Sequence, residues 1–117
     1  MKRAVLYLRV STERQARSGG EAEGYSIPAQ REAGTRKAES LGASVVDEYV
    51  DAGASAKSAD RVGLQSMLGR LEADRDVDFV IVHKLDRLAR SRMDDVMVVA
   101  EIERAGAVLV SVTENVD

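Results

Sequence analysis

Four short runs of apolar residues recur along the chain, and a polar stretch follows each of them. The runs are Ala4–Leu8, Val45–Val50, Val77–Val82 and Ala107–Val112. The first and third are almost continuously apolar, which is typical of strands that are buried on both faces of a parallel sheet. The pattern therefore predicts four β-strands in a mainly parallel arrangement.

The segments between these runs carry apolar residues at helical spacing. The first predicted helix runs from Ser26 to Leu41, and the third covers about Met93 to Ala105. The second is marked by apolar residues three and four positions apart, namely Leu64, Met67, Leu68 and Leu71. Strict alternation of strand and helix predicts an α/β fold, a three-layer sandwich around a mainly parallel sheet of four to five strands.

The third predicted helix has apolar residues on more than one face. One side carries Met93, Val96 and Ala100, and the other carries Val98, Val99 and Ile102. Packing on the sheet needs only one apolar side. The wider distribution leaves open that this helix also packs against a partner.

Composition narrows the class of protein. A chain of 117 residues with 44% hydrophobic and 32% charged residues is typical of one soluble globular domain. A net charge of −3 argues against nucleic-acid binding over the whole surface, but permits a local basic cluster. The sequence has no cysteine, which excludes disulfides, cysteine nucleophiles and cysteine-based zinc sites. Because it has a single histidine, histidine-rich metal sites are not expected either. We expect no cofactor.

Membrane and secretion signals are missing from the sequence pattern. No apolar run is long enough to span a bilayer. The apolar stretch that follows Lys2 and Arg3 is interrupted at Arg9, which is too early for a signal peptide. We therefore expect a cytoplasmic protein with no membrane partner.

Polar residues gather where three of the predicted strands end. Residues two apart in a strand share a face, so Tyr7, Arg9 and Ser11 are expected to point the same way. The third strand is followed by Lys84, Asp86, Arg87, Arg90 and Arg92, and the second by Asp51, Ser55 and Arg61. Ligands of open α/β sheets bind outside the carboxyl ends of the strands. These residues are therefore expected at one site.

One hydroxyl among several guanidinium groups indicates a phosphate site that contains a nucleophile. Arginine binds two phosphate oxygens at once and stays charged, and a serine hydroxyl needs a base or nearby positive charge to attack. Arginines can also stabilise the transition state of phosphoryl transfer without a metal. Taken alone, each group has a simpler interpretation, such as a strand-end loop or a solvated helix face with an Asp86–Arg90 pair. Likewise, Tyr7 and His83 alone would be structural residues.

Four stretches together resemble the catalytic domain of the serine recombinase (resolvase/invertase) family. They are YLRVSTERQ, GYSIPAQ, DAGASAKSADRVGL and VIVHKLDRLARS. They follow the family's order, and the resemblance covers essentially the whole chain. The GYSIPAQ stretch is similar in style to large serine integrases and transposon recombinases. The resemblance implies a resolvase-like fold and site-specific DNA recombination.

The resemblance also implies roles for individual residues. Ser11 matches the nucleophile that attacks a DNA phosphodiester to give a 5′-phosphoserine link and a free 3′-hydroxyl, before strand exchange and religation. The other matching catalytic residues are Arg9, Arg61, Asp86, Arg87 and Arg90. Supporting or phosphate-binding residues match Tyr7, Gln30, Ser55 and Lys84. Family members need no metal or ATP, because the covalent link conserves the phosphodiester energy.

The end of the chain departs from the family pattern. It stops at SVTENVD, where family members continue into a long dimerisation helix and a DNA-binding region. We therefore expect residues 1–117 to be a truncated catalytic domain that is inactive alone and monomeric or weakly associated. The full-length protein is expected to bind double-stranded DNA as a homodimer or tetramer. The alternative is a catalytically silent, DNA-associated assembly module on the same fold, which the presence of Ser11 and the arginines disfavours.

Overall fold

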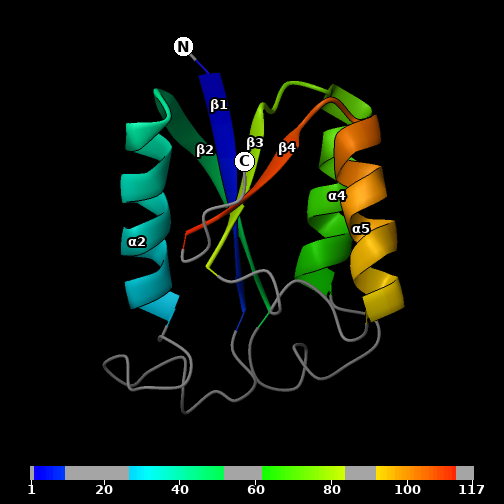
Figure 1. Cartoon of the computed structure of the whole chain (residues 1–117), viewed down its shortest axis with the longest axis horizontal. Coiled ribbons are helices and arrows are strands. Elements are labelled where there is room, and N and C mark those ends of the chain that lie inside the picture. The colour runs from blue at the N-terminus through cyan, green and yellow to red at the C-terminus, as the bar shows by residue number, and fades with distance from the viewer. Residues whose placement is uncertain (1, 10–26, 52–61, 84–91, 113–117) are drawn as a thin grey trace.

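Strands and helices alternate along the chain in the computed structural model, which describes residues 2–9, 27–51, 62–83 and 92–112. The elements are β1 Lys2–Arg9, α2 Ile27–Ser40, β2 Ala43–Asp51, α4 Val62–Asp74, β3 Phe79–Val82, α5 Arg92–Arg104 and β4 Val108–Ser111 (Figure 1). Every strand and helix that the apolar pattern predicts is present. The predicted start of the first helix at Ser26 lies outside the described residues.

The four strands of the described residues are parallel, in the order β2-β1-β3-β4. The central strand β1 pairs with β2 as far as Arg9↔Asp51, and with β3 as far as Tyr7↔Val82. Because the strands run the same way, their carboxyl ends meet at one edge of the sheet (Figure 1). This arrangement confirms the predicted α/β fold.

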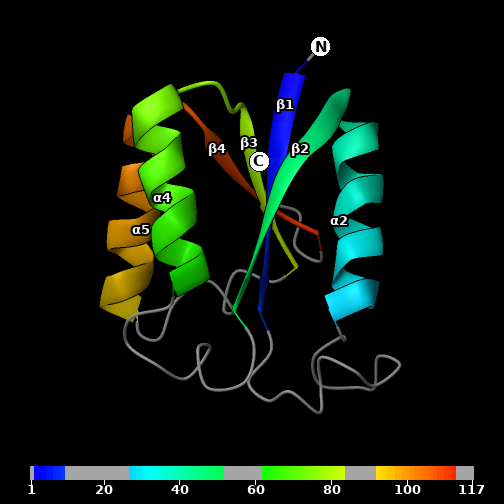
Figure 2. The ribbon, with the colours of Figure 1, turned by 180° about the vertical axis from the view of Figure 1, so that it is seen from behind.

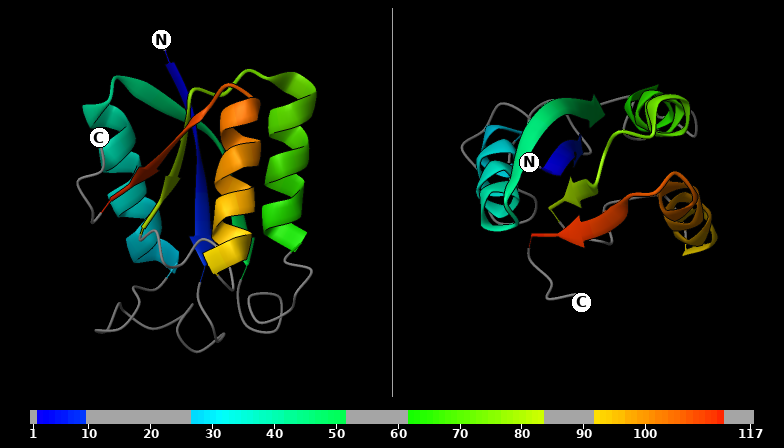
Figure 3. Two further views of the ribbon diagram at one scale, coloured as in Figure 1. Left: turned by 45° about the vertical axis from the view of Figure 1, so that its right-hand side comes forward. Right: turned by 90° about the horizontal axis from the view of Figure 1, so that it is seen from above.

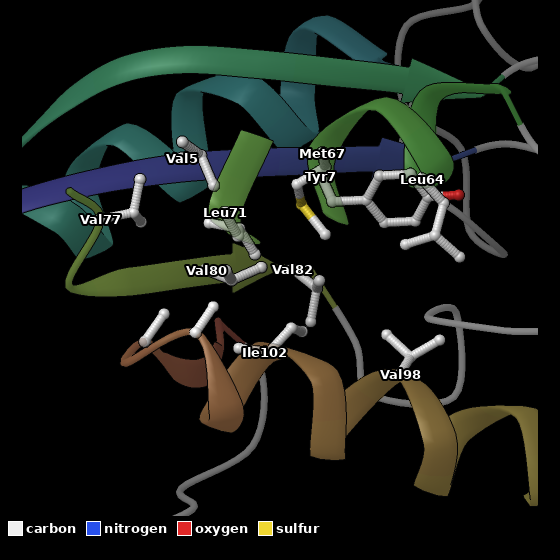
Figure 4. Close-up of a cluster of buried hydrophobic side chains, with 12 residues drawn as sticks. Val5, Tyr7, Leu64, Met67, Leu71, Val77, Val80, Val82, Val98 and Ile102 are labelled. Atoms are coloured by element: carbon white, nitrogen blue, oxygen red, sulfur yellow. The ribbon is translucent and has the colours of Figure 1, made fainter. Parts of the chain in front are cut away.

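The helices form two layers around the sheet. The helix α2 covers one face, and α4 and α5 lie side by side on the other (Figures 2 and 3). The larger core cluster fills the space between the sheet and the α4–α5 layer, and includes Val5, Tyr7, Met67, Leu71, Val80, Val82 and Ile102 (Figure 4). The α2 side is filled by Ala4, Leu6, Leu8, Ile27, Ala38, Ala43 and Ile81. Since β1 supplies both clusters, its run of apolar residues is continuous rather than alternating.

Gly34 lets α2 lie close to β1. A Cβ atom at this position would stand 2.8 Å from Cδ2 of Leu6, which is buried under the helix. Glycine costs about 1 kcal/mol relative to alanine inside a helix. The close contact between helix and strand explains why the helix contains it.

The two apolar sides of α5 have different surroundings. Val98 and Ile102 are buried against the sheet, whereas Val96 and Met97 are 65% and 60% exposed. Packing on the sheet therefore accounts for only one of the two sides. None of the helices in the described ranges is long and apolar enough to cross a bilayer.

Candidate active site

Within the described ranges, the buried polar side chains gather at the carboxyl edge of the sheet. They are Gln30, Asp51, His83 and Ser111. Asp51 and Ser111 end β2 and β4, His83 directly follows β3, and Gln30 lies near the start of α2. A buried polar group is costly unless it is hydrogen-bonded, so the partners of these side chains are informative.

Asp51 joins the ends of β1 and β2 to the start of α4. Its Oδ2 accepts hydrogen bonds from the Tyr7 hydroxyl at 2.8 Å and the Leu64 N–H at 3.0 Å, while Oδ1 accepts one from the Gly63 N–H at 2.8 Å. The first N–H groups of a helix lack partners within the helix, and the helix dipole favours a negative charge there. A carboxylate that is 1% exposed is stabilised by these donors. Figure 4 shows the Tyr7 hydroxyl directed toward Leu64.

These contacts fix both ends of the segment between β2 and α4. Residues 52–61, which include Ser55 and Arg61, begin directly after Asp51, and α4 follows them. A Cβ atom on Gly63 would lie 2.7 Å from the carbonyl oxygen of Val50 and 3.0 Å from Oδ1 of Asp51. Only glycine allows α4 to start this close to the end of β2.

A second contact, which is partly buried, holds the end of β1. The side-chain Oε1 of Gln30 accepts a hydrogen bond from the Arg9 N–H at 3.3 Å, and its Nε2 donates to the Arg9 carbonyl at 3.1 Å. Arg9 and Gln30 lie on either side of residues 10–26, which include Ser11. The two ends of this segment are therefore joined as well.

A third contact lies where β3 ends. The Ser111 hydroxyl donates to the His83 carbonyl at 3.4 Å, and the Val112 N–H donates to the Val82 carbonyl at 2.9 Å. These bonds tie the end of β3 to the end of β4. Residues 84–91 begin directly after His83 and contain Lys84, Asp86, Arg87 and Arg90. Three segments that carry hydroxyls and arginines thus leave the sheet from its carboxyl edge, each from a fixed starting point.

The family model described as "Resolvase, N terminal domain" matches residues 4–117. The chain belongs to the resolvase N-terminal domain family. The confirmed resemblance covers nearly its whole length.

Solved structures place the chain among serine recombinase catalytic domains of this family. It is similar to the N-terminal catalytic domain of TP901-1 integrase, with 32% identity and a TM-score of 0.79 over 99% of this chain and 81% of that one. It is similar to a resolvase family site-specific recombinase from Streptococcus pneumoniae, with 32% identity and a TM-score of 0.78 over 100% and 76% of the two chains. A curated relative, "Uncharacterized immunity region protein 3" of Bacillus phage phi105, is 42% identical over 61% of this chain and 80% of its own length.

Three of the predicted site residues of this resolvase-family domain are described. Arg9 ends β1, Gln30 binds the main chain of Arg9, and the buried Tyr7 donates to Asp51. The others lie outside the described residues: Ser11, Ser55, Arg61, Lys84, Asp86, Arg87 and Arg90. The expected convergence of the arginines on Ser11 therefore stays a prediction.

Sequence reasoning did not assign a role to Asp51 or Ser111. Asp51 was grouped with the loop that follows β2, although it accepts hydrogen bonds from β1 and α4. The available signal was a carboxylate that directly closes an apolar strand. Ser111 gave no signal, because a serine within an apolar run is common at a strand end.

A second polar cluster connects α4 to β2 and to the segment before β3. Arg70 contacts Asp47 and Asp76, each at 3.1 Å, and Asp76 also pairs with Arg3 at 2.9 Å. Burial would raise the pKa of the Asp76 carboxyl, but hydrogen bonds from Arg70 and Arg3 outweigh it and hold that pKa below its ordinary value. The pKa of the Tyr49 hydroxyl is raised above its ordinary value, and burial is the largest cause. This cluster links secondary-structure elements and contains none of the predicted site residues.

Proposed function

We propose that this domain cleaves and rejoins DNA as the catalytic domain of a site-specific serine recombinase, with Ser11 as nucleophile. The observation that carries the proposal is that three segments, containing Ser11, Arg61 and the Arg87–Arg90 pair, start from the same edge of a parallel sheet. Buried or partly buried hydrogen bonds hold each starting point. Family membership and likeness to integrase and recombinase catalytic domains support the same reaction.

The reaction is an exchange of one phosphodiester for another. The Ser11 hydroxyl gives up its proton, and its oxygen forms a bond to the DNA phosphorus. The bond from phosphorus to the 3′ oxygen breaks, and that oxygen takes a proton to become a free 3′-hydroxyl. The 5′ end stays on Ser11 as a phosphoserine ester. After strand exchange, another 3′-hydroxyl attacks this ester and releases the serine, so no external energy source is consumed.

The arginines supply charge stabilisation. Arg9, Arg61, Arg87 and Arg90 would bind the non-bridging phosphate oxygens, whose negative charge grows in the transition state. Asp86 would orient the guanidinium of Arg90, which is four residues further along the chain. Tyr7, Ser55 and Lys84 would support this arrangement. The first two act through hydrogen bonds and the lysine through its charge.

Double-stranded DNA is the proposed substrate, and the protein would bind it as a dimer or tetramer. With 17 basic and 20 acidic residues, this domain by itself can neutralise few phosphates at once. Tight DNA binding would then depend on several copies or on other parts of the protein. The proposed chemistry uses no cofactor.

A covalent adduct tests the proposal. The protein, expressed from its complete natural gene, is incubated with duplex fragments of the DNA that flanks the gene, and denaturing gels detect protein-linked DNA. We expect an adduct with wild type and none with Ser11→Ala, at equal DNA binding. Ser44→Ala is the matched control, because Ser44 is exposed at the opposite end of β2. DNA binding by wild type without any adduct would favour the silent assembly module instead.

A further inference from the structure

The side-chain amide of Gln30 binds both main-chain groups of a single residue. It accepts from the Arg9 N–H at 3.3 Å and donates to the Arg9 carbonyl at 3.1 Å. A glutamine amide carries the same donor and acceptor as a peptide group. Gln30 therefore contacts Arg9 as a neighbouring strand does in a sheet.

This contact lies where the hydrogen-bonded ladder of the sheet runs out. The pairing of β1 with β3 stops at Tyr7↔Val82, two residues before Arg9, while the pairing with β2 continues to Arg9↔Asp51. Gln30 thus supports the last residue of β1 beyond the end of β3. Without it, one side of this strand end would lose a main-chain partner.

The Gln30 side chain is itself held in place. Gln30 is 5% exposed, and its helix α2 is packed on the sheet through Ile27, Gly34 and Ala38. A side chain buried in this way has little freedom to turn toward a ligand. Both hydrogen bonds described for its amide go to the main chain of Arg9.

We infer that Gln30 is a positioning residue for DNA cleavage, which acts through the main chain of Arg9 rather than by binding phosphate. This inference rests on the proposed function, because Ser11 follows Arg9 by two residues. A main chain fixed at Arg9 limits where the nucleophile and the Arg9 guanidinium can lie. A misplacement of about 1 Å in an active site can cost roughly a hundredfold in rate.

The test uses Gln30→Met, which keeps the length of the side chain and removes both hydrogen bonds. Gln65→Met makes the same chemical change at an exposed position of α4 and is the matched control. For each protein, single-turnover adduct formation at saturating DNA, the DNA dissociation constant and hydrogen exchange of the Arg9 amide are measured. Gln30→Glu is a second variant, since it keeps the acceptor for the Arg9 N–H and loses the donor when ionised.

We expect Gln30→Met to slow adduct formation by about ten- to a hundredfold with the DNA dissociation constant unchanged. Its Arg9 amide should exchange roughly tenfold faster, as expected for loss of one hydrogen bond, while the Leu6 amide stays protected and shows that the sheet is intact. Gln30→Glu should be intermediate and Gln65→Met like wild type.

Two failures are distinguishable. If wild type forms an adduct and Gln30→Met forms it equally fast, or if the Arg9 amide stays equally protected, Gln30 does not position the reaction. If wild type forms no adduct, the proposed function is wrong and the role of Gln30 in it is lost as well.

Discussion

The hydroxyl of Tyr7 donates a hydrogen bond of 2.8 Å to the buried carboxylate of Asp51. The two residues come from neighbouring strands, and the same carboxylate accepts hydrogen bonds from the Gly63 and Leu64 N–H groups in the first turn of α4. The contact therefore connects the centre of the sheet, the end of β2 and a helix start. Tyr7 and Asp51 therefore stabilise the fold. By doing so they also fix the ends of the segment that carries Ser55 and Arg61.

Removing the Tyr7 hydroxyl should destabilise the fold. Tyr7→Phe leaves a buried carboxylate with one donor fewer, and hydrogen bonds to charged groups contribute about 1.5–3 kcal/mol. Tyr49→Phe is the control, since its hydroxyl contacts the more exposed Asp47 at 3.1 Å and should cost below about 1 kcal/mol. Urea unfolding of both variants measures the difference. Equal losses would show that burial of Asp51 gives the Tyr7 contact no special weight.

Replacing Asp51 should cost more than replacing Tyr7. Asp51→Ala leaves the Tyr7 hydroxyl and the N–H groups of Gly63 and Leu64 without their acceptor, and loss of a helix cap together with a buried unsatisfied donor amounts to about 3 kcal/mol. The amides of Gly63 and Leu64 should lose protection from hydrogen exchange. Asp47→Ala, in the same strand but partly exposed, should cost below about 1 kcal/mol. Retained protection in Asp51→Ala would contradict this role.

Two glycines of α4 should respond in opposite ways to alanine. At Gly63 the new methyl would lie 2.7 Å from the main-chain oxygen of Val50, which cannot easily move, so we expect a loss of about 1–3 kcal/mol. At Gly69 the methyl would meet no atom within 4 Å, and alanine should stabilise the helix by about 0.5–1 kcal/mol. Thermal unfolding of both variants tests this contrast. Stabilisation by Gly63→Ala would mean that α4 does not start against β2.

The ion pairs of Asp76 should make stability depend on pH. Hydrogen bonds from Arg70 and Arg3 lower the pKa of this carboxyl in the folded state, so the unfolded chain binds its proton first as pH falls. The stabilisation should be fully present above the ordinary aspartate pKa of about 3.9 and decline as pH falls through the lower folded value. Denaturant unfolding of wild type and Asp76→Asn at each pH measures the gap between them, that is, the difference in their free energies of unfolding. If this gap widened as pH falls, the predicted direction of the pH dependence would be wrong.

Arg70→Met is the partner variant for that experiment. It removes the main cation that lowers the Asp76 pKa. When Arg70→Met is already present, adding Asp76→Asn should change the free energy of unfolding at neutral pH by less than it does in the wild type. The same gap with and without Arg70 would show that Arg3 alone accounts for the effect.

The fold was predictable because its signals are local. Continuous apolar runs mark strands covered on both faces, and β1 does contribute to both core clusters. Alternation with helices then leaves few arrangements. The strand ends were less predictable: β3 starts at Phe79 rather than Val77, because pairing with neighbours and not apolarity decides where a strand begins.

The site was predictable in its location and less so in its internal contacts. Polar residues after apolar strands indicate the carboxyl edge, and the resemblance suggested phosphate-binding roles. No sequence pattern shows that the Gln30 amide binds the main chain of a residue 21 positions earlier, or that Asp51 accepts a hydrogen bond from Tyr7. Such contacts depend on strand order and helix placement, which arise only in the folded chain.

The most direct test of the central claim is to map the amino acid that carries the DNA. The trapped adduct of the wild-type protein is digested with protease and nuclease, and tandem mass spectrometry locates the nucleotide. We predict a 5′-phosphonucleotide on Ser11 and a free 3′-hydroxyl on the other DNA end. A nucleotide on any other residue, or a 3′-phosphate linkage, would contradict the assignment of Ser11 as nucleophile.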